Sequence, residues 1–219
     1  MDLLEYEKKL YADGIELIAG VDEVGRGPLY GPVVVAAVVL PKGYILEGLT
    51  DSKKLTPKKR DAFYDIIMKD ALSVSVSAVG PKRIDEINIY EATKEAMYEA
   101  VNGLILKPEH VLIDAMKLEK LSMPSTSIIK GDMKSESIAA ASVIAKVTRD
   151  RMMDEAHYLH PEYGFDKHKG YPTKAHIENV LRYGVLEEYR MTYEPIKSII
   201  NGSDINEKNK KTKKQKVIE

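Results

Sequence analysis

The stretch that decides the fold of this chain is GVDEVGRGPLYGPVVVAAVVL, residues 20–40. A loop rich in Gly and Pro separates the apolar segment Ile15 to Val24 from the apolar run Val33 to Leu40. Two such segments joined by a loop of this composition predict a β-hairpin. The second run is far shorter than the ~20 residues that a membrane-spanning helix needs, so we interpret it as a buried strand.

Further elements are predicted outward from this hairpin. Alternating or apolar runs indicate strands at residues 72–79, 110–113 and 126–129. Helical patterns indicate helices at 61–70 just after Pro57, at 81–106 with a break near Asn88, at 135–158, and at 174–182. Ser135 is the expected N-cap of the long helix that follows it. Strands followed by alternating helices and strands indicate an α/β protein.

The composition limits the class of protein. The 219 residues are 44% hydrophobic and 31% charged, as in soluble globular proteins. We expect one folded unit over residues 1–200 and a basic, disordered tail over residues 201–219, where apolar residues are nearly absent. The chain has no cysteine and no apolar signal segment, which predicts a cytoplasmic protein. A net charge of −1 argues against a protein that coats nucleic acid by bulk charge alone.

Four acidic residues stand in positions that favour metal-ion chemistry. Asp22 and Glu23 lie inside the first strand, Asp114 ends the run HVLID, and Asp132 precedes the long helix. Carboxylates gathered at one sheet edge would repel each other by ~4 kcal/mol per pair at 4 Å and a dielectric of 20, so a cluster implies bound cations. Oxygen ligands without sulfur or histidine select Mg²⁺ or Mn²⁺. Two such ions can promote the hydrolysis of a phosphodiester.

Glu23 presents a geometric difficulty. Consecutive strand residues point to opposite faces, so Asp22 and Glu23 cannot both reach one site from a regular strand. We expect a bulge, a strand end beside Gly25, or a contact made through the backbone of Glu23.

Six motifs occur in the order seen in type 2 ribonucleases H, and the chain resembles ribonuclease HII over about residues 15–197. The motifs are GVDEVGRGPLYGPVVVAAVV, DSKKL, HVLIDAM, KGDMKSESIAAASVIAKVTRD, HPEYGFDKHKGYPTKAH and YRMTYEPIK. The resemblance implies an RNase H-like fold with a mixed sheet flanked by helices and an added helical C-terminal part. It also implies cleavage of the RNA strand of RNA–DNA hybrids, and cleavage 5′ of ribonucleotides embedded in duplex DNA, leaving 3′-hydroxyl and 5′-phosphate ends.

The resemblance also implies roles for individual residues. The family's catalytic and metal-holding carboxylates correspond to Asp22, Glu23, Asp114 and Asp132. The turn Gly25-Arg26-Gly27 and Tyr171 correspond to the groups that recognise the 2′-hydroxyl, the one group that distinguishes RNA from DNA at a given position. Phosphate contacts are expected from Ser52, Lys53, Lys134 and Ser135. We interpret His168 and His176 as hydrogen-bonded structural groups rather than metal ligands.

Two alternatives are considered at this point. A noncatalytic RNA–DNA binding module would be expected to lack at least one of the carboxylates, and none is substituted. A DNA-only nuclease or integrase of the same fold would have no use for the glycine-rich turn and Tyr171. The sister enzyme ribonuclease HIII typically has an extra N-terminal domain and a different residue in the middle of the turn, and neither feature fits this sequence, which favours ribonuclease HII. We expect a monomer that acts on RNA–DNA hybrids and ribonucleotide-containing DNA duplexes, with no membrane and no obligate protein partner.

Overall fold

A mixed five-stranded sheet forms the centre of the molecule. The structure is a computed structural model that describes residues 3–50, 52 and 55–202. The strand order is β3-β2-β1-β4-β5. The strands are β1 (Ile18–Val24), β2 (Val33–Val39), β3 (Ser73–Val79), β4 (His110–Asp114) and β5 (Ser125–Ile128). The predicted hairpin is confirmed, since β1 and β2 pair antiparallel, as do β2 and β3.

The two sides of β1 are different. Its pairing with β4 is parallel, as is the pairing of β4 with β5. Val21 lies beside Ile113 in this register, so the next residues along the two strands are Asp22 and Asp114. The carboxyl end of a parallel pair is where α/β proteins form their sites.

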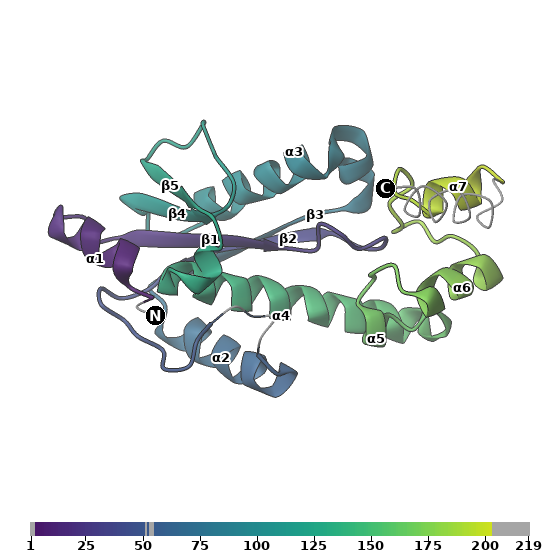
Figure 1. The fold of residues 1–219 in the computed structure, drawn as a ribbon, viewed down its shortest axis with the longest axis horizontal. Coiled ribbons are helices and arrows are strands. Elements are labelled where there is room, and N and C mark those ends of the chain that lie inside the picture. The colour runs from purple at the N-terminus through teal and green to yellow at the C-terminus, as the bar shows by residue number, and fades with distance from the viewer. Residues whose placement is uncertain (1–2, 51, 53–54, 203–219) are drawn as a thin grey trace, which may run out of the picture.

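Helices cover both faces of the sheet (Figure 1). Helix α3 (Pro81–Asn102) packs on one face and α4 (Glu136–Leu159) on the other, with α2 (Pro57–Asp70) against the outside of α4. The break predicted in α3 is present, because Asn88 has a φ of 68°. Helix α4 approaches β1 so closely that a Cβ atom on Gly20 would lie 2.0 Å from the carbonyl carbon of Ser137.

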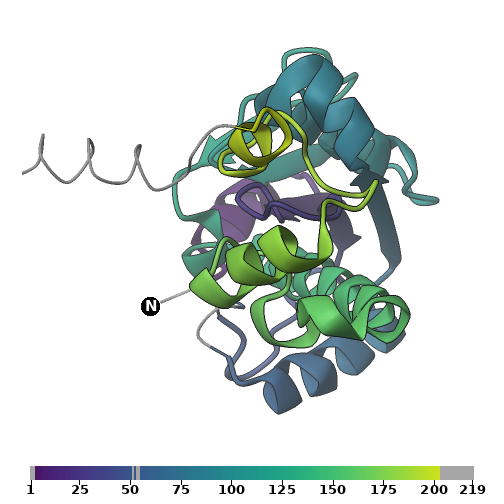
Figure 2. The same ribbon diagram turned by 90° about the vertical axis from the view of Figure 1, so that its right-hand side faces the viewer.

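A helical C-terminal part lies beyond one end of the sheet (Figure 2). The segment between α4 and α6 (Lys174–Tyr183) contains two short helices, and its aromatic residues Tyr163 and Phe165 are buried. The elements of this part are η2 (Pro161–Tyr163), α5 (Phe165–His168), α6 and α7 (Ile196–Ile200). Their core includes Tyr30, Tyr163, Phe165 and Tyr189, with the rings of Tyr30 and Phe165 stacked at 4.1 Å. The mixed sheet, its flanking helices and this helical part confirm the predicted fold.

The remaining elements lie near the start of α4. Helix α1 (Glu5–Ala12) contacts this region through Glu7, and Leu3 just before the helix accepts from the Glu136 amide. The 3-10 helix η1 (Gly131–Met133) precedes α4. Among the described residues, no helix is long and apolar enough to cross a membrane. The predicted basic tail falls almost wholly in residues 203–219, outside the part of the chain that the structure describes.

Candidate active site

Asp22 is a buried carboxylate at the end of the central strand. Its side chain is 6% exposed, and burial raises its pKa well above the ordinary value. The negative charges of Glu23 and then Asp114 raise this pKa further, against smaller opposing effects from a hydrogen bond with Ser142 and from the Glu23 amide. Three acidic side chains from two strands are therefore close enough to repel one another.

Glu23 reaches this group without a bulge. The pairing of β1 with β2 is regular through Asp22 and Glu23, so the predicted bulge is wrong, whereas the strand does end at Val24 beside Gly25. The Glu23 amide donates a 2.7 Å hydrogen bond to the Asp22 carboxylate. Burial raises the pKa of Glu23, Arg26 at 3.6 Å lowers it, and the charge of Asp114 raises it. The other carboxylate oxygen of Glu23, Oε2, is buried and has no hydrogen-bond partner.

Asp114 and Asp132 are connected through one backbone amide. The amide of Gly131 donates a 2.7 Å hydrogen bond to the Asp114 carboxylate, and Asp132 follows directly in η1 with 9% of its surface exposed. Ala115 and Lys130 flank this connection and both have positive φ, 51° and 58°. Such conformations cost on the order of 1 kcal/mol or more for residues other than glycine, and they cluster at functional sites.

The four acids fit a divalent cation by their chemistry. Within the described part of the chain, no three acidic or histidine side chains are close enough to hold a metal ion as they stand. Burial is the main cause of the raised pKa of Asp22 and Glu23, the charges of neighbouring acids add to it, and Oε2 of Glu23 has no hydrogen-bond partner among the described residues. Hard oxygen ligands suit Mg²⁺ or Mn²⁺.

The expected phosphate contacts have different outcomes. Ser52 is buried, and its hydroxyl is 2.8 Å from the hydroxyl of Ser142, so it lies beside the group that bonds Asp22. Lys53 lies outside the described residues. Lys134 is half-buried, two residues after Asp132.

Ser135 requires a correction. It caps α4 as predicted, since its hydroxyl accepts from the Ile138 amide at 3.2 Å. That hydroxyl is fully buried and also donates to the Glu7 carboxylate at 2.6 Å, so it is not presented to a phosphate. Glu7 also accepts from the Ser137 amide, and α1 therefore holds the start of α4 in place. The sequence analysis missed Glu7, which looks like an ordinary surface acid of an amphipathic helix.

The turn at Gly25-Arg26-Gly27 is fixed by a buried arginine that the sequence analysis also missed. Arg190 is fully buried and its guanidinium donates to the carbonyl oxygens of Gly25, Arg26 and Gly31. Within the described residues, the amides of Arg26 and Gly27 donate no hydrogen bond. With its carbonyls occupied, the turn offers N–H donors to a ligand.

A second buried arginine holds the other side of the turn. Arg149 in α4 donates to the carbonyl oxygens of Tyr30, Pro32 and Lys169. Its Nε would lie 2.3 Å from a Cβ atom on Gly25, which has a φ of 94°, so only glycine fits there. One signal for Arg149 was present in the sequence: Ser135, Ser142 and Arg149 recur every seven residues along the alanine-rich face of one helix.

Tyr171 lies against the turn, as expected. Its ring atom Cε1 is 3.7 Å from the Cβ position of Gly27, and the residue is 38% exposed. The carbonyl of Gly170 accepts a 2.8 Å hydrogen bond from the Leu29 amide, so the loop bearing Tyr171 is joined to the segment that follows the turn. An exposed aromatic ring beside free backbone donors is suited to contact a sugar.

Comparison with known proteins finds one family over most of the chain. The family model described as Ribonuclease HII matches residues 19–194. A Ribonuclease HII from Bacillus cytotoxicus is 58% identical over 200 residues, which are 91% of this chain and 77% of the relative. The crystal structure of the ribonuclease H2 from Pyrococcus horikoshii OT3 has a TM-score of 0.73 and 31% identity, and the match covers 84% of this chain and 96% of that one. The structure of the PCNA:RNase HII complex from Archaeoglobus fulgidus gives a TM-score of 0.68 and 30% identity, and the match covers 81% of this chain and 95% of that one.

Proposed function

The chain belongs to the ribonuclease HII family, whose members are endoribonuclease hydrolases, and from this premise we propose that it cuts RNA–DNA hybrids and DNA duplexes 5′ of an embedded ribonucleotide. Cleavage at that position leaves a 3′-hydroxyl and a 5′-phosphate. The observation that carries the proposal is the group formed by Asp22, Glu23 and Asp114, which repel one another beside a turn whose amides are free.

Two divalent ions, Mg²⁺ or Mn²⁺, would be held by Asp22, Glu23, Asp114 and Asp132. When bound, they supply an activated water and stabilise the leaving oxygen of the phosphodiester. The unpaired oxygen of Glu23 and the raised pKa of Asp22 support this assignment, because a bound cation would relieve both.

The chain's own residues would select the nucleotide that is cut. The free amides of Arg26 and Gly27 would donate to oxygens of the ribose or its phosphate, and Tyr171 would contact the 2′-hydroxyl from the other side. Ser52 would approach the phosphate near Asp22, and Lys134 would add positive charge. Buried carboxylates alone cannot distinguish RNA from DNA. The turn and Tyr171 therefore favour a ribonuclease over a DNA-only nuclease of the same fold.

The test is the cleavage pattern of end-labelled duplexes. One duplex contains a single ribonucleotide, a second is all DNA, and a third is a long RNA–DNA hybrid, each incubated with Mg²⁺, Mn²⁺ or a chelator. We expect one cut 5′ of the ribonucleotide, cuts along the hybrid, no cut in the all-DNA duplex, and none with chelator. Cleavage of the all-DNA duplex would favour the alternative nuclease.

The matched variant is Asp132→Asn. It removes one charge at nearly constant volume, so the protein should fold and bind the duplex yet not cut it. Binding without cleavage by the unaltered protein would instead favour the noncatalytic binding module. The expectations of a monomer and of a cytoplasmic location stay predictions.

A further inference from the structure

A fully buried histidine connects the Tyr171 loop with the C-terminal segment. His176 lies in the first turn of α6, with its Nδ1 2.9 Å from the carbonyl oxygen of Tyr171. Its Nε2 is 2.7 Å from the hydroxyl of Tyr189, which is also buried. The two ring nitrogens therefore contact two segments that are 18 residues apart in the chain, 171 and 189.

The hydrogen bonds assign one tautomer to this ring. A carbonyl oxygen can only accept, so Nδ1 of His176 carries the proton and Nε2 accepts from the Tyr189 hydroxyl. His168 is stacked on the same ring at 4.0 Å, accepts from the Gly170 amide through Nδ1, and faces the Tyr163 carbonyl oxygen with Nε2. Burial lowers the pKa of His176 to about 4, so the ring is neutral at physiological pH.

Tyr189 is adjacent in the chain to the residue that bonds the glycine-rich turn. The next residue is Arg190, whose guanidinium donates to the carbonyls of Gly25 and Arg26. The amide of Arg190 donates to the Leu29 carbonyl at 2.9 Å. The hydrogen bonds of His176 thus join Tyr171 on one side of the candidate ribose site with the residue that fixes the turn on the other.

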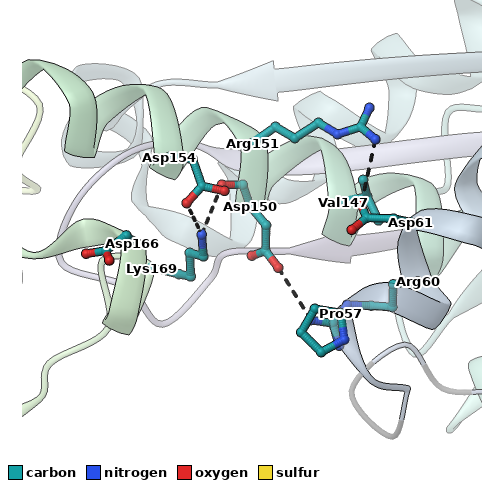
Figure 3. Close-up of a pocket in the computed structure, with 9 residues that line it drawn as sticks. All are labelled: Pro57, Arg60, Asp61, Val147, Asp150, Arg151, Asp154, Asp166 and Lys169. Atoms are coloured by element: carbon teal, nitrogen blue, oxygen red, sulfur yellow. Dashed lines mark hydrogen bonds and ion pairs between the residues drawn. The ribbon is translucent and has the colours of Figure 1, made fainter.

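The Tyr171 loop has further attachments. The Tyr171 amide donates to the His168 carbonyl, and the Tyr171 carbonyl also accepts from the Thr173 amide, both at 2.8 Å, but these bonds stay within the loop. Other contacts lie on the side of Lys169. Figure 3 shows the Lys169 side chain directed toward Asp154, in a charged pocket of ≈ 260 Å³ beside α4. The Lys169 carbonyl accepts from Arg149. These contacts hold the loop before Tyr171, whereas His176 is the side chain that holds the Tyr171 backbone itself.

We propose that His176 is a positioning residue for ribonucleotide selection: its two hydrogen bonds set the Tyr171 backbone relative to the turn at Gly25-Arg26-Gly27. This inference rests on the proposed function, because it assigns Tyr171 and the turn to the ribose. It adds that selectivity depends on a residue that touches no substrate and acts through Tyr171.

The experiment measures selectivity by binding, in full-length protein carrying Asp132→Asn so that no duplex is cut. Fluorescence anisotropy with Mg²⁺ gives the ratio of dissociation constants for an all-DNA duplex and the same duplex with one ribonucleotide. This ratio is insensitive to the fraction of folded protein, because both duplexes bind the same folded molecules. A merely structural role would leave it unchanged.

His176→Phe keeps a buried aromatic ring and removes both hydrogen bonds, and we expect it to reduce the ratio about tenfold, as the loss of one to two hydrogen bonds would. His176→Asn places an amide donor near the position of Nδ1 and should restore most of the selectivity. Tyr171→Phe combined with His176→Phe should reduce the ratio no further than the larger single effect, since both act through one group. The matched control is His110→Phe. It removes a buried histidine of β4 that is hydrogen-bonded to Thr126 of β5, and it should not change the ratio.

An unchanged ratio in His176→Phe overturns the inference, as do additive effects in the double variant. If the Asp132→Asn protein with His176 unchanged binds both duplexes equally, it does not select the ribonucleotide, and the proposed selectivity is overturned together with the inference. The two failures are distinguishable, because the second is visible before any histidine is changed.

Discussion

Replacement of Arg190 by lysine tests whether the buried guanidinium holds the glycine-rich turn. Arg190 donates to three carbonyl oxygens, those of Gly25, Arg26 and Gly31, and it is fully buried. The Arg26 carbonyl also accepts from the Tyr193 hydroxyl, so it keeps a donor. A lysine ammonium at this depth can reach one of the two remaining carbonyls, those of Gly25 and Gly31, which leaves one buried carbonyl without a donor. At ~1 to 3 kcal/mol for an unsatisfied group, Arg190→Lys should lower the free energy of unfolding by about 1 to 3 kcal/mol.

The assay is urea denaturation followed by circular dichroism, which gives the unfolding free energy and its denaturant dependence. The control is Arg83→Lys, because Arg83 is an exposed arginine paired with Glu86 and Glu95, and exposed pairs contribute about 1 kcal/mol or less. If Arg190→Lys is within about 0.5 kcal/mol of the unaltered protein, the hydrogen bonds do not hold the turn and the reasoning is refuted.

Three further predictions concern packing and charge. Gly20→Ala should lower the unfolding free energy by ~3 kcal/mol or more, because its Cβ would overlap the backbone of α4, and soluble yield and urea denaturation would measure this. The pKa of Asp22 is higher in the folded protein than in the unfolded chain, where it is near 4. Without metal, the Asp22 carboxyl therefore contributes to the free energy of unfolding at a pH below about 4, and this contribution is lost as the pH rises through the pKa of the folded state. Asp22→Asn should therefore be more stable than the unaltered protein at pH 8 with chelator, and a thermal scan that shows equal stability at pH 8 would contradict this. Mg²⁺ at about 100 times its dissociation constant should stabilise the unaltered protein by ~2.7 kcal/mol and Asp22→Asn by much less, as differential scanning fluorimetry would report.

The sequence was sufficient for the hairpin and for three of the four acids to be placed in relation to each other. Asp22 lies near the end of β1 and Asp114 ends the neighbouring β4, and the apolar patterns of both strands are plain, so their proximity follows from strand order. Asp132 was placed through the motif around it and through the N-cap at Ser135. Of the three arrangements expected at Glu23, the bulge is absent, whereas the strand end beside Gly25 and the contact through the Glu23 backbone are both present.

The side chains that hold the site together were much harder to predict. Arg149 donates to backbone carbonyls, and so does Arg190 apart from one bond to the Tyr193 hydroxyl. A contact with a backbone carbonyl requires no complementary residue anywhere in the sequence. Ser135 illustrates a related limit, because its position in the motif is compatible with both a phosphate contact and a buried cap. His176 was expected to be a structural group, but its partners, Tyr171 and Tyr189, depend on how the C-terminal part folds back.

The attachment of the turn to Arg190 has a consequence for the order in which the protein is made. The ribosome has finished every one of the four acids once Asp132 is added, yet the group that fastens the turn beside them is added 58 residues later, at position 190. A nascent chain that stops short of position 190 carries the acids but lacks the guanidinium that bonds the carbonyls of Gly25 and Arg26. Under the proposed function, the acids are therefore synthesised well before the turn proposed to contact the ribose can be fixed in place.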